Sequence, residues 1–187
     1  TAGRGIVHSE RTPPELVGAR YATHGLQIWV ALPTAHEDDP PSFQHAPGAT
    51  LPVIERPGAR LRVLLGAWAD VASPVRVWSP LTYVIAELAA GARLDVPAFQ
   101  PERALYVIDG ELTVDGEPAP LGPHELAVLT PAAPATLHAR APTRVALFGG
   151  APLEGPRYLL WNFVASTKAR LDQARIDWIA RRFPTIA

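Results

Sequence analysis

Two side chains that bind metal ions well stand one residue apart near the start of the chain. The segment GRGIVHSE places His8 and Glu10 directly after a glycine-rich stretch. If the backbone is extended there, both side chains point to the same face, with Cα atoms about 6.6 Å apart. One metal ion can accept both, and an imidazole with a carboxylate suits non-haem Fe, Mn, Zn or Ni. On spacing alone, two solvated side chains near a chain end are the simpler explanation.

Composition limits which other chemistry is available. The 187 residues include no cysteine, so disulfides, thiolate ligands and a cysteine nucleophile are excluded. Lys and Arg number 17 against 18 Asp and Glu, without a block of like charge, so nothing electrostatic indicates nucleic acid or an anionic membrane as a partner. No apolar run reaches the roughly 18 to 20 residues of a membrane helix, and we expect a cytoplasmic protein. The chain has no Met and begins in a glycine turn; we therefore expect a preceding segment.

The elements that must position His8 and Glu10 are predicted to be strands. The 21 prolines and 14 glycines separate short apolar runs, which is typical of an antiparallel sandwich or barrel. Strands are predicted over 25–33, 61–66, 76–80, 83–88, 104–109, 111–116, 125–130 and 144–149. The polar, proline-rich stretch 33–52 is predicted to be a connection.

The end of the chain alone is predicted to be helical, over 167–183. Ser166 or Thr167 can cap this helix, and apolar residues such as Leu171 recur on one face. Arg181 and Arg182 would then lie in its last turn and complement the helix dipole.

Several blocks of sequence together resemble the pirin family over nearly the whole chain. The most specific are the opening GRGIVHSE and the closing WNFVAST, and HGLQIWVALP, LPVIERPGARLRVLLG and ERALYVIDGELTVDG follow in order between them. The resemblance implies an all-β bicupin, here a C-terminal cupin barrel (double-stranded β-helix or jelly roll) plus the remainder of an N-terminal barrel, from a bacterial source. The implied division is 1–55 for that remainder and the connection, 56–155 for the C-terminal barrel, and 156–187 for a segment with the amphipathic helix.

The same resemblance implies a metal, usually iron, in the first barrel. In the family three histidines and one glutamate hold it, and His8 and Glu10 match two of these positions; the other histidines belong to an H-P-H block upstream of residue 1. Two ligands cannot enclose iron or another divalent metal tightly, so binding is expected only when the upstream histidines are present. Gln27 either hydrogen-bonds near the metal or is a satisfied core glutamine. Structural or solvated roles are expected for the other candidate imidazoles, His24, His36, His45 and His138.

The second barrel is predicted to lack a metal. A metal-binding cupin carries a Gly, a His-x-His pair and a Glu, but Pro97 and Phe99 stand at the approximate places of the pair. Glu102 remains, and a local ion pair beside Arg103 or a turn contact explains it more simply than a metal does. His124 is predicted to be a turn residue and His138 an outward-facing strand residue.

By the same resemblance, the function is that of a quercetin 2,3-dioxygenase, with a flavonol or similar aromatic molecule as substrate. Glu10 would be catalytic by accepting the proton of the substrate hydroxyl. The alternative is a non-catalytic, iron-dependent redox sensor that binds a transcription regulator or metabolic enzyme. A third possibility is a folded remnant that is inert because its site is incomplete.

Overall fold

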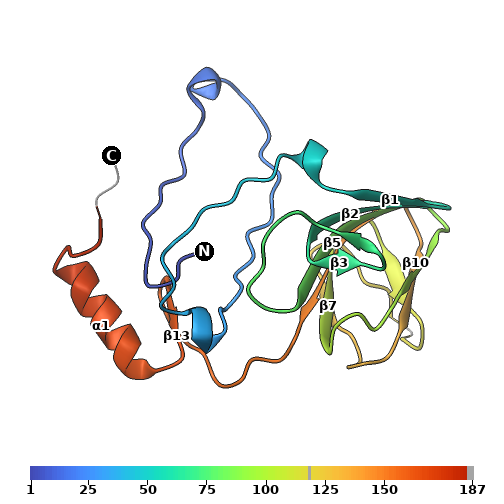
Figure 1. Cartoon of the computed structure of the whole chain (residues 1–187). Helices are drawn as coiled ribbons and strands as arrows, with labels where there is room; N and C mark the ends of the chain where they lie inside the picture. Colours follow the sequence, from blue (N-terminus) through green and yellow to red (C-terminus); the bar gives the residue numbers. More distant parts are fainter. Residues whose placement is uncertain (118, 185–187) are drawn as a thin grey trace. The chain divides into compact units, whose positions relative to one another are not determined.

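The computed structural model describes residues 1–117 and 119–184 and divides the chain into two compact units. Unit 2 is the continuous segment Gln44–Pro152, and unit 1 combines Thr1–Phe43 with Leu153–Ala187. The three-part division predicted from the sequence keeps the two chain ends apart, whereas here they belong to one unit. Figure 1 gives the element labels used below.

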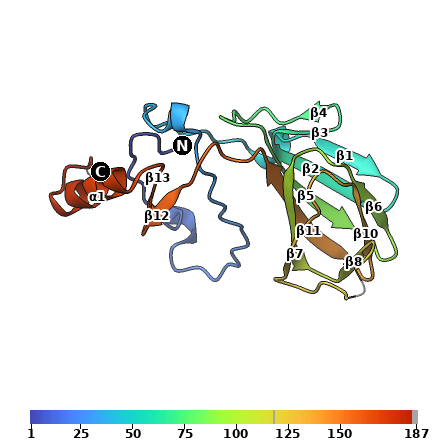
Figure 2. The ribbon, with the colours of Figure 1, turned by 90° about the horizontal axis from the view of Figure 1, so that it is seen from below.

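Unit 2 is built from antiparallel strands in two facing sheets (Figure 2). The larger sheet has the order β1-β2-β5-β11-β7-β9, the smaller has the order β6-β10-β8, and β3 and β4 form a short hairpin. The 3-10 helix η3 (Gly48–Thr50) precedes them, and the strands are β1 (Val53–Arg56), β2 (Ala59–Leu65), β3 (Ala67–Trp68), β4 (Val71–Ala72), β5 (Leu81–Leu88), β6 (Arg93–Val96), β7 (Glu102–Asp109), β8 (Leu112–Val114), β9 (Leu126–Val128), β10 (Ala135–Ala139) and β11 (Thr143–Gly150).

The core of unit 2 lies between the two sheets. Side chains alternate in and out along each strand, so that β5 buries Val84, Ala86 and Leu88 on one face. The smaller sheet contributes fully buried residues such as Leu112 and Leu137 to the same cluster. The predicted all-β organisation is thus confirmed, and six of the predicted strands correspond to β2, β5, β7, β8, β9 and β11.

Two predicted strands are wrong, and backbone hydrogen bonding explains both. In the stretch 76–80, the N–H and C=O of Arg76 bond to the side-chain amide of Gln44, at 2.9 and 3.2 Å, in place of a strand. The stretch 25–33 has apolar side chains such as Trp29 but pairs with no strand among the described residues, and Trp29 is 51% exposed. An apolar pattern does not make a strand where no partner strand supplies hydrogen bonds.

Unit 1 contains the helix, one hairpin and long irregular segments. Its elements are η1 (Pro14–Leu16), η2 (Thr34–His36), β12 (Tyr158–Leu160), β13 (Phe163–Ala165) and α1 (Lys168–Ile179). In the described structure residues 1–52 form no strand, so the expected remainder of an N-terminal barrel is not a sheet here.

Helix α1 is capped as predicted but is shorter than predicted. Thr167 accepts a hydrogen bond from the Arg170 N–H at 3.3 Å. The helix ends at Ile179, and Arg181 takes the left-handed conformation with φ of 54°. Arg181 and Arg182 therefore lie beyond the last turn, so their predicted dipole role is wrong. Arg182 instead donates to Asp177 at 2.8 Å.

Replacement of Gly66 by alanine should strongly destabilise unit 2. Gly66 has φ of +66°, and a Cβ there would overlap the Leu81 carbonyl oxygen. Gly91→Ala is the matched control, because Gly91 has φ of +75° but open space around it. Backbone strain costs each variant about 1 kcal/mol, and the overlap adds about 1–3 kcal/mol for Gly66 alone. Urea unfolding followed by circular dichroism measures both, and equal free energies of unfolding would contradict the structure.

Candidate functional site

The predicted ligand pair lies on an exposed, irregular segment of unit 1. His8 and Glu10 are both exposed and belong to no helix or strand. The residues just before them are anchored, because Arg4 N–H donates to the Asp39 carbonyl at 3.0 Å. Gly3 permits this approach with φ of +52°, since a Cβ would overlap the Asp39 backbone. The glycine-rich turn thus has a structural explanation of its own.

The described residues do not by themselves complete a metal site. Within residues 1–117 and 119–184, no three His, Cys, Asp or Glu side chains gather as a metal ion requires. Zinc sites in proteins use three or four protein ligands, so His8 and Glu10 would need further donors to hold such a metal. The roles of His8 and Glu10 as ligands stay predictions. Gln27 is exposed, so it is not a core glutamine, and its role beside a metal also stays a prediction.

The remaining histidines lie at turns and surfaces. His24 and His45 are exposed, and His36 bonds to Asp39 at 2.8 Å within unit 1. His124 is a turn residue with φ of 70° and contacts the Tyr106 hydroxyl at 3.1 Å. His138 is on β10 and pairs with Asp115 at 2.7 Å on the outer face. The predicted structural or solvated roles agree with these positions.

The predicted ion pair between Glu102 and Arg103 is wrong. Neighbouring residues on β7 point to opposite faces, so Glu102 is exposed while Arg103 is 2% exposed. Arg103 donates to backbone carbonyl oxygens of Pro97, Thr130 and Ala133.

A buried polar network in unit 1 joins the connection to the C-terminal segment. Arg157 and Glu37, whose side chains are 7% and 11% exposed, lie 3.4 Å apart. Ser166 Oγ donates to Glu37 Oε2 at 2.7 Å, and Arg157 Nη2 donates to the Leu32 carbonyl at 2.8 Å. Sequence inspection missed this network, because partners separated by more than a hundred residues leave no local pattern. The network holds the backbone around Glu37 in place. Asp39, two residues further on, accepts the hydrogen bond that anchors the start of the chain.

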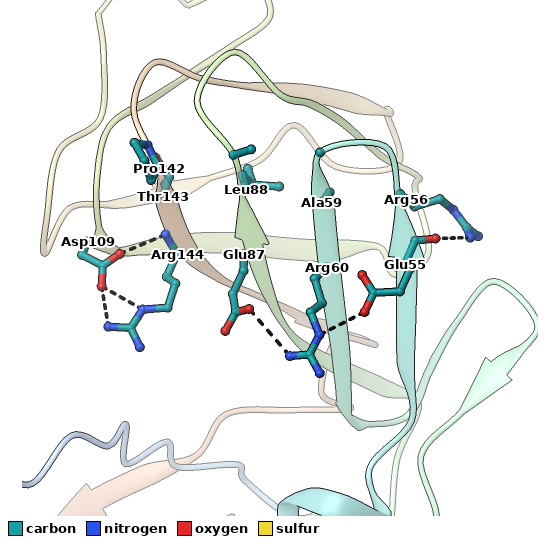
Figure 3. A pocket seen from close by; sticks show the side chains of 12 residues that line it. Glu55, Arg56, Ala59, Arg60, Glu87, Leu88, Asp109, Pro142, Thr143 and Arg144 are labelled. Carbon is teal, nitrogen blue, oxygen red and sulfur yellow. Dashed lines mark hydrogen bonds and ion pairs between the residues drawn. The ribbon is translucent and has the colours of Figure 1, made fainter.

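A hollow in unit 2 is lined by paired charges (Figure 3). It encloses about 560 Å³ at one end of the larger sheet. Five charged residues follow one another across neighbouring strands there, and each lies opposite the next in the strand register: Glu55, Arg60, Glu87, Arg144 and Asp109. Arg60 is 3.0 Å from Glu55 and 3.7 Å from Glu87. The hydrogen bond with Asp109 raises the pKa of Arg144. We call these five residues the charge ladder.

The three carboxylates and two guanidiniums of the ladder leave one negative charge, which Arg56 in the same lining balances, so little remains to attract a charged ligand. The arrangement is therefore a structural feature of an exposed sheet face.

The two facing antiparallel sheets with an apolar core define unit 2 as a barrel of the cupin class. Residues 83–184 match the Pirin C-terminal cupin domain, and the chain belongs to the pirin family, as the sequence blocks predicted. A "Pirin-like protein" of Caulobacter vibrioides is 43% identical over 186 residues, which are 97% of this chain and 62% of that protein.

Two crystal structures of quercetin 2,3-dioxygenase from Acinetobacter baumannii are also similar. One has a TM-score of 0.78 and 27% identity over 85% of this chain and 56% of that one. The other has a TM-score of 0.76 and 34% identity over 84% of this chain and 53% of that one. The chain thus spans less than two thirds of the length of the relatives it matches. No helix in the described part of the chain has the length and apolar character needed to cross a membrane.

Replacement of Glu154 by glutamine should make the stability of unit 1 less dependent on pH in the acid range. Thr34 donates both its hydroxyl, at 2.6 Å, and its backbone N–H to Glu154 Oε1, and these bonds lower the pKa of Glu154 to about 2. Because the pKa is lower in the folded state, the stabilisation is complete above the ordinary value of 4.5 and is lost as pH falls from there towards 2.

Thermal unfolding of the wild-type protein and of Glu154→Gln between pH 2 and 7 tests this. The Tm of the wild-type protein should exceed that of Glu154→Gln by a constant amount above about pH 5, and this difference should shrink below that pH. Glu15→Gln, at an exposed position of the same unit, is the control. A difference that grows on acidification would contradict the assigned contacts.

Proposed function

We propose that this chain is part of a metal-dependent oxygenase of the quercetin 2,3-dioxygenase type. The similarity to two crystal structures of that name, at 27% and 34% identity, supports the proposal. The proposed cofactor is iron or another divalent metal, and its substrate an aromatic molecule such as a flavonol. His8 and Glu10 are the proposed donors from this chain, and the remaining donors are proposed to lie outside the 187 residues.

In this proposal the two residues have separate tasks. His8, in its neutral form, presents one ring nitrogen to the metal while the other ring N–H is free to bond an acceptor. Glu10 has an exposed carboxylate on an irregular segment, where a substrate can reach it. Its oxygen is proposed to accept the proton from the flavonol hydroxyl next to the ring carbonyl.

Replacement of Glu10 by glutamine tests the catalytic role. The variant keeps an oxygen at this position but removes charge and basicity, so quercetin turnover should fall by about 100-fold or more. The free energy of unfolding should change by less than about 0.5 kcal/mol, because Glu10 is exposed. Oxygen uptake with quercetin is measured on the complete product of the gene, at known iron content. Glu15→Gln is the matched control.

Two outcomes would contradict the proposal. Equal turnover by Glu10→Gln would remove Glu10 from the mechanism. Iron-loaded wild-type protein that leaves quercetin untouched would exclude the proposed substrate. If that protein also retained a transcription regulator or metabolic enzyme only in the presence of iron, the binding function would replace the enzymatic one.

Replacement of His8 by alanine tests metal binding independently of turnover. Loss of a ligand should lower the iron affinity of the complete gene product by at least about tenfold. His24→Ala is the matched control, since His24 is also an exposed histidine of unit 1. Competition with a chelator of known affinity measures both variants. Equal iron affinity in wild type and His8→Ala would show that His8 is not a ligand.

A further inference from the structure

Arg103 is a buried cation at one end of the unit 2 barrel. It lies on the same inward face of β7 as Leu105 and Val107, and it is 2% exposed. Among the described residues no carboxylate forms an ion pair with it, and its Nε has no hydrogen-bond partner. Burial without a counter-charge lowers its pKa. A buried charge is costly unless its hydrogen bonds compensate for the lost water, so these bonds must matter to the structure.

The hydrogen bonds of Arg103 go to two separate loops. Nη1 donates to the carbonyl of Pro97, at 3.0 Å, in the loop that follows β6. Nη2 donates to the carbonyls of Thr130, at 2.8 Å, and of Ala133, in the loop between β9 and β10. The planar guanidinium spans both loops at once, with donors directed to each side.

Gly149 and Phe99 lie close to the Arg103 side chain. Gly149 on β11 lies opposite Arg103 in the register, and a Cβ there would overlap the Glu102 carbonyl oxygen and come within 2.9 Å of Arg103 Cγ. The guanidinium carbon lies 5.9 Å from the centre of the Phe99 ring, and Phe99 in turn packs against the buried Trp68 with ring centroids 5.3 Å apart. The glycine thus permits the close approach of β7, including the start of the Arg103 side chain, and the Phe99 ring lies beside the guanidinium.

We propose that Arg103 is a latch that holds both loops closed over this end of the barrel. The guanidinium keeps the loop after β6 and the loop before β10 in one arrangement, and Phe99 and Trp68 seal the end beside it. Because one rigid guanidinium carries the bonds to both loops, a movement of this side chain releases both loops together. The interior of this barrel is accordingly closed to small molecules at this end.

Hydrogen exchange on the complete gene product tests the latch through Arg103→Met. Methionine fills much of the same space but donates no hydrogen bonds. Exchange should rise about tenfold or more in both 97–101 and 130–134, because bonds from a charged donor are lost in each loop. Arg103→Lys should protect at most one loop, since an ammonium group cannot span both. Arg93→Met, at a 61% exposed arginine on β6, is the control. Unchanged exchange, or an increase in one loop alone under Arg103→Met, would overturn the proposal.

A measurement on the wild-type protein tests the proposal even if the variants do not fold. Nitrogen-15 NMR of the arginine side chains should show the Arg103 guanidinium with separate, slowly exchanging Nη signals, assigned through contacts with the Phe99 ring. A guanidinium held by three hydrogen bonds to two loops cannot rotate freely about the Nε–Cζ bond. A single averaged signal, like that of an exposed arginine, would show that no latch exists.

Discussion

Strand β11 pairs along nearly its whole length with β5 on one side and β7 on the other, and unit 2 depends on this pairing. Its inward residues Val145 and Leu147 are fully buried, and its backbone groups are satisfied by two strands that lie far from it in the sequence. One irregularity interrupts the pairing with β7, between Arg144 and Val145. That shift interrupts the alternation along β7, so that Asp109 lies beside Arg144 on the outer face although it is two residues from the buried Val107.

Alternation of apolar residues was sufficient to predict the strands at the centre of unit 2. In β5 and β7 the inward residues are apolar except for Thr82 and Arg103, so the pattern and the tertiary structure agree over most of both strands. The same pattern failed over 25–33, where Leu26, Trp29 and Val30 remain exposed. Alternation of apolar residues indicates which side chains a strand would bury. It does not indicate whether a partner strand is present to supply hydrogen bonds, because that depends on the whole fold.

For the candidate site, the sequence indicated types of residue better than their arrangement. The pirin family was predicted from short blocks because the blocks record backbone requirements, such as the close approach of Gly3 to Asp39. The predicted ion pair of Glu102 with Arg103 is wrong, because neighbouring residues of a strand point to opposite faces. The contacts of Glu37 with Arg157 and Ser166 join distant segments, and no local pattern encodes them.

The charge ladder favours one alignment of neighbouring strands, which the apolar core does not do by itself. If β11 slipped by two residues along β5, inward positions would still be occupied by apolar side chains, and the core would remain chemically acceptable. On the outer face, however, Arg144 would face Ile85 or Ala89 in place of Glu87. Each strand junction from β1 to β7 carries such a pair, so a shifted sheet would lose attraction at several junctions together. The ladder thus discriminates between alternative alignments of the same strands, and its contribution lies in the uniqueness of the fold more than in its stability.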